Sequence, residues 1–254
     1  DSFLSSWPGP DSLSAMNRRP TSIILQAIAI PFIIAGVVVV MLAMDGQSET
    51  AQYGVVRPLA YLLGSISWGY MLLQLKMGVD VREYGSGRTG MSNVLRTGGV
   101  KSAAVVLTLD ITKGVVAVII ARTVIATEGA EVAAALIVLV GHNWPVFLRF
   151  KGGRGILTAL GGLALMVPVA AIVATATFLT ITALSRYISL GSVVGVVIGA
   201  LAILALALAG VNSATYMVYG FIACTIIVWQ HRDNIQRIRD GNERRLGHPA
   251  TKVE

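Results

Sequence analysis

The sequence predicts an all-α fold, a polytopic bundle of transmembrane helices. Hydrophobic residues make up 55% of the chain and charged residues only 13%, whereas soluble domains carry about 25% charged residues. The mean hydropathy is +0.73, and several apolar stretches approach the roughly 20 residues that a helix needs to cross a bilayer. These stretches are continuously apolar rather than alternating with polar residues, which favours helices over a membrane β-barrel.

The candidate spans follow one another with short polar connections, after a Ser-, Pro- and Gly-rich segment, 1–20, that predicts a disordered tail. The fifth and sixth spans are shorter than a full crossing, and Pro168 separates them. They form either two short tilted helices or one broken helix. The expected spans cover residues 21–44, 55–77, 101–122, 131–148, 155–168, 169–185, 190–210 and 214–231.

The distribution of charge decides between these alternatives. With eight crossings, nearly all basic residues fall on one side of the membrane, which is the cytoplasmic side by the positive-inside rule. The other side then carries only Arg57 and Arg122, next to acidic residues. Merging 155–185 into one span would move the basic C-terminal segment to that side. We therefore expect both termini to be cytoplasmic, and we relate the net charge of +7 to topology and anionic ligands rather than nucleic acid.

The most informative polar segment is 85–96, which reads Gly-Ser-Gly-Arg-Thr-Gly-Met-Ser-Asn-Val-Leu-Arg. Its glycines allow backbone N–H groups to face a shared concavity that binds phosphate. Arg88 and Arg96 add guanidinium groups that match phosphate oxygens. The segment formally matches the dinucleotide motif G-x-G-x-x-G, but membrane helices flank it instead of a strand and an amphipathic helix. It predicts a phosphate cradle, the alternative being a flexible loop whose arginines only set topology.

A second glycine-rich loop lies on the same side of the membrane. Lys151 and Arg154 flank Gly152 and Gly153 directly before a predicted helix. A glycine-rich turn with cations at a helix N-terminus is a second candidate anion site. We therefore expect two phosphate-bearing substrates to meet at this face.

Three further features bear on chemistry. His231 and Asn234 share a face if the last helix continues, although a basic segment after a span also serves as a topology anchor. Asp110 and Lys113, inside the third span, either pair with each other or face a polar cavity. The single Cys224 excludes an intrachain disulfide. The chain has neither metal-ligand spacing nor a G-x-S-x-G elbow nor a His-x4-Asp pair, so no metal site is expected.

The three polar segments resemble, in order, the motifs of the bacterial membrane glycerol-3-phosphate acyltransferases that use acyl phosphate, the PlsY family. The first motif, roughly G-S-G-N-x-G-A-T-N-x-x-R, is matched by Gly85, Ser86, Gly87, Gly90, Asn93 and Arg96. The second, G-H-x-x-P-x-F-x-x-F-K-G-G-K-G, is matched from Gly141 through Gly155. The third, H-x-x-N-I-x-R-x-x-x-G-x-E, is matched by His231, Asn234, Ile235, Arg237, Gly241 and Glu243.

The resemblance covers residues 55–247, which are expected to form the acyltransferase membrane domain, with a C-terminal tail at 248–254. It implies a seven-helix family core plus one extra N-terminal helix at 21–44. The chain departs from the first motif where Arg88 replaces Asn and Met91-Ser92 replaces Ala-Thr, and from the second where Arg154 replaces Lys.

The resemblance also implies a reaction, transfer of an acyl group from acyl phosphate to the 1-hydroxyl of sn-glycerol 3-phosphate. Lysophosphatidic acid and phosphate would form directly, without an acyl-enzyme, a metal or a cofactor, at the cytoplasmic face of a bacterial inner membrane. The alternatives are a non-catalytic phosphate-binding, lipid-binding or transport paralogue, and an enzyme that uses acyl-CoA.

The same resemblance assigns roles to individual residues. By motif position, Ser86, Arg96 and Lys151 would hold glycerol 3-phosphate and carry catalysis. The Gly152-Gly153 backbone, His231 and Asn234 would hold acyl phosphate, and Asn93, His142 and Glu243 would shape the site. The remaining candidate substrate-binding residues are Gly85, Gly87, Arg88, Gly90 and Arg154.

Overall fold

The computed structural model describes residues 21–248 and 250–252, and the predicted tail at 1–20 lies outside this range. The described chain is helical throughout its core. Its α-helices are α1 (Thr21–Ala43), α2 (Glu49–Ser65), α3 (Trp68–Met77), α4 (Met91–Val124), α5 (Glu128–Asn143), α6 (Ile156–Met166), α7 (Pro168–Ser185), α8 (Ile188–Leu208), α9 (Thr215–Gln230) and α10 (Arg232–Arg239).

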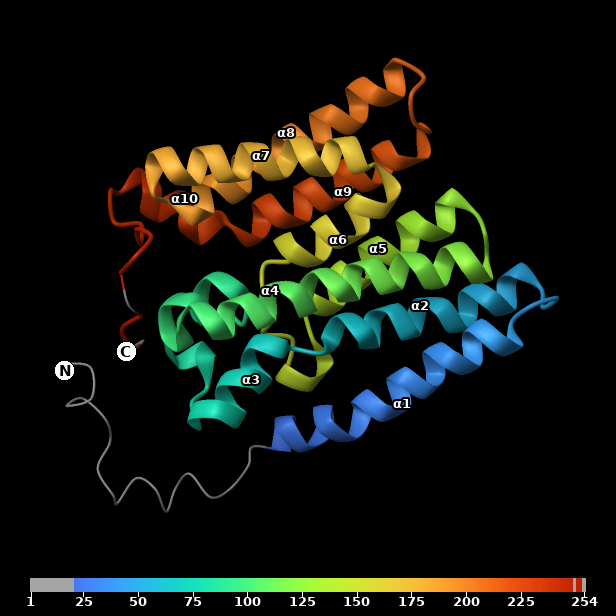
Figure 1. Ribbon diagram of the computed structural model, residues 1–254, viewed down its shortest axis with the longest axis horizontal. Helices are drawn as coiled ribbons and strands as arrows, with labels where there is room; N and C mark the ends of the chain where they lie inside the picture. Colours follow the sequence, from blue (N-terminus) through green and yellow to red (C-terminus); the bar gives the residue numbers. More distant parts are fainter. Residues whose placement is uncertain (1–20, 249, 253–254) are drawn as a thin grey trace.

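The long helices run back and forth along one direction of the bundle (Figure 1). Five of them, α1, α4, α5, α7 and α8, are long and apolar enough to cross a membrane, and α6 and α9 are shorter apolar helices. The segments that join α3 to α4 and α7 to α8 lie at the left-hand end in Figure 1, together with α10, and the segment that joins α5 to α6 lies in the same half of the picture. The polar loops predicted to lie on one side of the membrane therefore gather at one end of the molecule.

The fifth and sixth spans form two helices and not one broken span. The chain reverses at Val167, and Pro168 occupies the first turn of α7, where its missing N–H costs nothing. The two helices run in opposite directions (Figure 1). Because α6 has only 11 residues, it rises about 16 Å, about half the hydrocarbon thickness. The loop before α6 consequently enters the bundle from the basic end.

Three other elements differ from the spans expected from hydropathy. The stretch 55–77 is divided at Ile66 and Ser67, whose non-helical backbone separates α2 from α3. The helix expected to begin at 101 begins at Met91 and bends at Gly99, where φ is +77°. The last helix does not continue through His231, because α9 ends one residue before it and α10 begins one residue after it.

Small residues let the central helices approach closely. A Cβ on Gly64 of α2 would overlap the Val138 carbonyl of α5, and one on Gly141 would overlap the Tyr61 carbonyl of α2. A Cβ on Gly161 of α6 would similarly overlap a backbone carbonyl of α4. Such contacts are the usual means by which membrane helices associate. They fix α2, α4, α5 and α6 around the inner end of the polar loops.

Candidate active site

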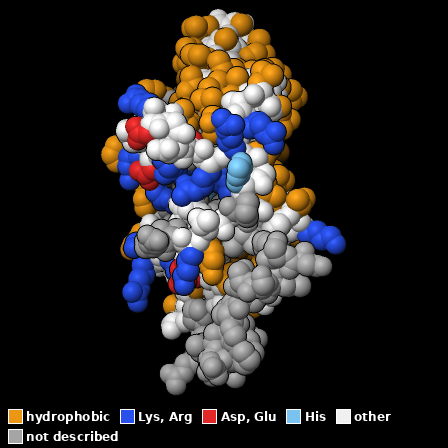
Figure 2. Space-filling view, turned by 90° about the vertical axis from the view of Figure 1, so that its left-hand side faces the viewer, with side chains coloured by type: hydrophobic (Ala, Val, Ile, Leu, Met, Phe, Trp, Pro, Cys, Tyr) orange, Lys and Arg blue, Asp and Glu red, His pale blue; other side chains and the backbone are white. Residues whose placement is uncertain are grey.

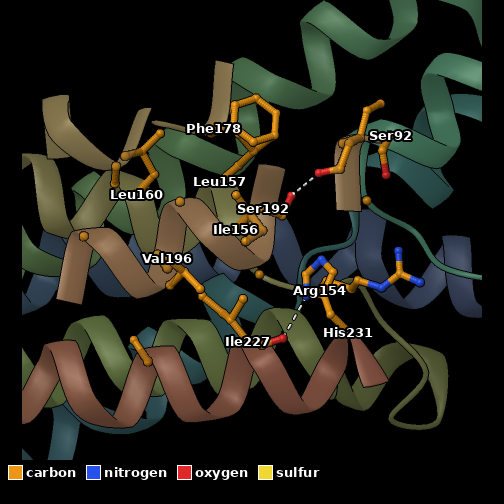
Figure 3. Close-up of a pocket in the computed structure, with 18 of the residues that line it drawn as sticks. Ser92, Arg154, Ile156, Leu157, Leu160, Phe178, Ser192, Val196, Ile227 and His231 are labelled. Carbon is orange, nitrogen blue, oxygen red and sulfur yellow. Dashed lines mark hydrogen bonds between the residues drawn. The ribbon is translucent and has the colours of Figure 1, made fainter. Parts of the chain in front are cut away.

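A pocket of about 360 Å³ lies among α4, α6, α7, α8 and α9 at the basic end of the bundle. Its two ends differ in chemistry. Toward the loops it is lined by Arg88, Arg96 and Arg154, and deeper in the bundle by apolar side chains such as Leu160 and Phe178. Figure 3 shows Ser92, Arg154 and His231 on one side of the pocket and Leu160, Phe178 and Val196 on the other.

The three arginines are incompletely neutralised. Arg88 is 3.9 Å from Asp233, at the limit of an ion pair. Arg96 and Arg154 have no carboxylate within ion-pair distance in the described part of the chain. Arg96 donates to the Arg244 carbonyl at 3.3 Å and Arg154 to the Gln230 carbonyl at 3.2 Å. Lys and Arg side chains gather across this end of the molecule (Figure 2). A pocket with surplus cations is suited to anionic ligands.

Burial and neighbouring cations act together on Arg154. Desolvation, followed by the repulsion of Arg88 and Arg237, lowers the pKa of the Arg154 guanidinium to about 9. Burial likewise lowers the pKa of Arg88. A buried cation has lost hydration and here has no full carboxylate partner. An incoming anion supplies the missing charge interaction and is therefore bound strongly. The N-terminus of α4, at Gly90, Met91 and Ser92, lines the same pocket and adds its first-turn N–H groups.

Asn93 organises the predicted phosphate cradle from within. Its buried amide nitrogen lies 2.9 Å from the carbonyls of Val81, Tyr84 and Arg88, and its Oδ1 accepts from the Ser86 N–H at 3.1 Å. The Ser86 hydroxyl is buried and has no hydrogen-bond partner among the described residues. The cradle therefore holds one unused hydroxyl beside its bonded backbone.

Positive φ angles explain the glycines of this cradle. Gly85 has φ +56° and Gly87 has φ +68°, values that other residues rarely adopt. A Cβ on Gly85 would also overlap the Asn93 side chain. Both glycines serve the shape of the loop, and neither lines the pocket.

The third motif closes the opposite wall. His231 and Asn234 are buried and both line the pocket, even though α9 ends just before His231 and Asn234 belongs to α10. His231 Nδ1 donates to the Ile227 carbonyl at 2.8 Å, a bond visible in Figure 3, which leaves Nε2 for other partners. Glu243 accepts from Asn234 at 2.7 Å and from Ser189 of α8 at 2.7 Å. The motif thus ties α8, α9 and α10 together.

The Glu243 carboxylate is held in its charged form. Burial alone would raise its pKa, but hydrogen bonds from Asn234, Ser189 and Arg237 outweigh burial and lower the pKa below its usual value. The Arg237 Nε lies 2.8 Å from Glu243 Oε2. Glu243 is therefore a charged anchor of the pocket wall and also offsets part of the surplus positive charge.

The turn after α5 differs from its expected role. The Gly152 N–H donates to the Asn143 carbonyl at 3.2 Å and the Gly153 N–H to the His142 carbonyl at 3.1 Å. These two N–H groups are therefore not free to hold a phosphate in this arrangement. These glycines leave room for the neighbouring residues, because a Cβ on Gly153 would overlap the His142 ring. Lys151 is exposed and lies outside the pocket lining.

A buried charged cluster lies on the α4–α5 side of the pocket. Lys113 Nζ is 2.9 Å from Asp110 Oδ1, and His142 Nδ1 is 3.6 Å from the same oxygen. Asp110 and His142 line the pocket, whereas Lys113 lies behind them. Both hypotheses for the Asp110–Lys113 pair therefore hold in part, since the pair is mutual and one member faces a cavity. Asp110 and His142 lie on different helices, α4 and α5. Their proximity therefore does not appear as a local His-x4-Asp motif in the sequence.

The predicted site residues thus divide into two groups. Those that line the pocket are Arg88, Gly90, Arg96, His142, Arg154, His231, Asn234 and Glu243. Those that lie behind or beside it are Gly85, Ser86, Gly87, Asn93, Lys151, Gly152 and Gly153. Lining residues that the sequence analysis did not assign to the site include Ser92, Ser189 and Ser192. Ser92 stands in the first motif at a position where the motif has Thr, whereas Ser189 and Ser192 lie in an apolar helix with no motif to distinguish them.

Part of the expected C-terminal tail packs on the cradle. The Gly85 N–H donates to the Thr251 carbonyl at 2.8 Å, and the Ala250 N–H donates to the Arg96 carbonyl at 3.2 Å. Tyr84 and Lys252 form an isolated antiparallel bridge. Residues 250–252 therefore cover the outer side of the loop that precedes α4.

Fold and pocket define an integral membrane protein with a cavity that combines a cationic end with an apolar interior. Comparison with known proteins makes the class specific. The family model described as glycerol-3-phosphate acyltransferase matches residues 55–241. The chain belongs to this glycerol-3-phosphate acyltransferase family.

Relatives and solved structures agree with this assignment. Glycerol-3-phosphate acyltransferase 3 of Dehalococcoides mccartyi is 44% identical over 204 residues, which cover 75% of this chain and 94% of that protein. The enzyme of Thermoanaerobacter pseudethanolicus is 41% identical over 189 residues, covering 74% and 93%. The glycerol 3-phosphate form of PlsY (YgiH), an integral membrane glycerol 3-phosphate acyltransferase, aligns with TM-score 0.70 and 35% identity, covering 76% of this chain and 94% of PlsY. Its lysophosphatidic acid form gives TM-score 0.68 at the same coverage.

Proposed function

We propose that this acyltransferase takes its acyl group from acyl phosphate and transfers it directly to the 1-hydroxyl of sn-glycerol 3-phosphate. The hydroxyl oxygen attacks the acyl carbonyl carbon, and the bond from that carbon to the phosphate oxygen breaks. The hydroxyl proton passes to a phosphate oxygen, so lysophosphatidic acid and inorganic phosphate form. An acyl phosphate is already activated, and the protein has only to position the substrates and stabilise charge.

The observation that supports this proposal is the surplus of cations at one end of an otherwise apolar pocket. Each substrate carries a phosphate group with close to two negative charges at neutral pH. Arg88, Arg96 and Arg154 would offset the repulsion between two such groups, and the apolar residues beyond them would accommodate the acyl chain. A donor without its own phosphate group beside the reacting carbon would leave part of this charge unused.

Roles follow from position. Arg96, which lines the pocket, would hold glycerol 3-phosphate. By motif position Ser86 and Lys151 would assist it from outside the lining, and the buried Ser86 hydroxyl lacks a partner among the described residues. His231 and Arg154 would hold acyl phosphate at the opposite wall. Gly152 and Gly153 would position His142 rather than donate hydrogen bonds. We place this site at the cytoplasmic face of a bacterial inner membrane, because the basic loops gather at the pocket end of the molecule and basic loops favour the cytoplasmic side.

One assay tests the donor. The purified full-length protein is given palmitoyl phosphate, and phosphate release is measured with and without glycerol 3-phosphate. We expect release that depends on the acceptor, and none when palmitoyl-CoA replaces the donor. Transfer from palmitoyl-CoA alone would contradict the proposed donor. Binding of both substrates without release would instead favour a non-catalytic paralogue.

Two substitutions test the acceptor site. Ser86→Ala and Arg96→Ala should each reduce transfer by about 100-fold, because a hydrogen bond to a charged group contributes about 1.5–3 kcal/mol and acts here on a reacting substrate. Arg239→Ala is the matched control, since it removes an exposed arginine from α10 at the same end of the protein. Near-normal turnover in either test variant would contradict the assignment.

A further inference from the structure

Helix α1 lies outside the matched family region, yet it carries a fully buried polar side chain. Gln26 is 0% exposed, although many of the residues around it on α1 face outward. Its Nε2 donates to the Ser22 carbonyl at 3.2 Å. Its Oε1 accepts from the Ser67 backbone N–H at 2.8 Å. A helix that served only as a lipid-facing anchor would have no use for a buried amide.

The partner of Gln26 is the break between α2 and α3. There the non-helical backbone of Ile66 and Ser67 leaves the Ile66 carbonyl and the Ser67 N–H without a partner in either helix. The Ile66 carbonyl accepts from Lys113 Nζ at 3.2 Å. This carbonyl and the Ser67 N–H belong to one peptide unit. Gln26 therefore holds one side of that unit while Lys113 holds the other.

From this peptide the contacts continue to the pocket. Lys113 Nζ also binds the Gly64 carbonyl at 3.3 Å and Asp110 Oδ1 at 2.9 Å. Asp110 lies 3.6 Å from His142 Nδ1, and both of these residues line the pocket. A displacement of the peptide would shift the lysine, then the aspartate, and finally the wall of the pocket.

A second contact joins α1 to the polar loops. The Ser22 hydroxyl is hydrogen-bonded to the Tyr70 hydroxyl. The Arg82 guanidinium lies over the Tyr70 ring, 5.0 Å from its centre, and donates to the Leu148 carbonyl at 3.3 Å. Leu148 begins the turn that leads to Lys151. Helix α1 thus supports the two polar loops from outside the family core (Figure 1).

We propose that Gln26 is a positioning residue of the active site, acting through the Ile66–Ser67 peptide on Lys113, Asp110 and His142. The expected change in kcat rests on the proposed function. The contact between Gln26 and Ser67 does not depend on that proposal. It makes α1 a working part of the enzyme and not only an added membrane anchor.

The test compares three variants of the full-length protein. Gln26→Leu removes the acceptor at nearly constant volume, and Gln26→Glu retains an acceptor oxygen. Ile33→Ala is the control, because it removes buried packing from the same helix without touching the polar chain. The kcat and KM for glycerol 3-phosphate are measured together with hydrogen exchange of the Ser67 amide.

We expect Gln26→Leu to lower kcat about tenfold with little change in KM, because misplacement by about 1 Å costs up to about 100-fold in rate. Gln26→Glu should recover most of that loss, and Ile33→Ala should leave kcat near the wild-type value. The Ser67 amide should exchange faster in Gln26→Leu only. Equal kcat losses in Gln26→Leu and Ile33→Ala would reduce Gln26 to a packing role and overturn the proposal.

Hydrogen exchange keeps the contact testable if the kinetics fail. In the wild-type protein the Ser67 amide should be strongly protected, and rapid exchange there would contradict the contact, whether or not the variants fold. If the Ser67 amide is protected but the protein transfers no acyl group from palmitoyl phosphate, the proposed donor is contradicted. The Gln26 contact is supported all the same.

Discussion

At the scale of single residues, Arg88 is the clearest departure from the family motif. It lines the pocket at a position where the motif has Asn, and its nearest carboxylate, on Asp233, is 3.9 Å away. Arg88 also repels Arg154 and helps to lower the pKa of that guanidinium. The positive charge of Arg88 therefore attracts phosphate and at the same time destabilises the charged form of Arg154.

These opposing effects lead to a prediction for Arg88→Asn. Transfer to glycerol 3-phosphate should stay within about tenfold of wild type, because the loss of one charged contact is partly offset by relief of Arg154. Steady-state kinetics with both substrates measure the change. Asp233→Asn is the companion variant, since it leaves Arg88 in place without its carboxylate. A complete loss of turnover in Arg88→Asn would make Arg88 an essential ligand.

Several polar residues of the pocket lining stand in motifs that the sequence shows, but their relations to one another do not. Arg96, Arg154 and His231 stand in recognisable motifs, and their chemistry is clear from residue type and spacing. The Asp110–His142 proximity joins α4 to α5, so no local pattern contains it. The bonded N–H groups of Gly152 and Gly153 are likewise a property of the folded turn, because a sequence does not reveal which carbonyls stand opposite.

At the scale of helices, hydropathy located the apolar stretches but not their interruptions. The α2–α3 break and the bend at Gly99 occur within or beside apolar sequence, whereas Pro168 marked the end of the short α6. Apolar sequence indicates burial in lipid or protein. It does not distinguish a buried helix from a buried break between helices, because both are apolar. The breaks are stabilised by distant partners such as Lys113 and Gln26, which a sequence window does not include.

The apolar end of the pocket allows a prediction about acyl-chain length. Ala223 of α9 lines it and is only 3% exposed. Ala223→Leu should fill part of this space and lower transfer of palmitoyl relative to lauroyl groups by about tenfold, as expected when a pocket loses room for a methylene or two. Ala205→Leu, on the exposed face of α8, is the control. Equal effects on both chain lengths would contradict an acyl-binding role for this region.

At the scale of the whole molecule, the basic loops lie at one end of the bundle and the less basic connections, such as that between α1 and α2, lie at the other. The α1–α2 connection lies at the end away from the pocket (Figure 1), and it is acidic where the pocket end is basic. The eight-crossing topology expected from charge is compatible with this arrangement, because each successive long helix reverses direction. Its orientation in the membrane stays a prediction.

Cysteine labelling tests that orientation. In a Cys224→Ala background, Ser48→Cys lies between α1 and α2, and Asn242→Cys lies beyond α10 at the pocket end. Both positions are exposed. We expect a membrane-impermeant maleimide to label Ser48→Cys in intact cells and Asn242→Cys only after permeabilisation. The reverse result would place the pocket outside the cytoplasm.

The contacts of residues 250–252 have a practical consequence for handling the protein. Thr251 bonds to Gly85 and Ala250 to Arg96, so a purification tag fused close behind these residues adds bulk beside the loop that is proposed to hold the acceptor. Activity measured with such a fusion would combine the enzyme's own turnover with the effect of the tag on that loop. A removable C-terminal tag, assayed before and after cleavage, would separate the two.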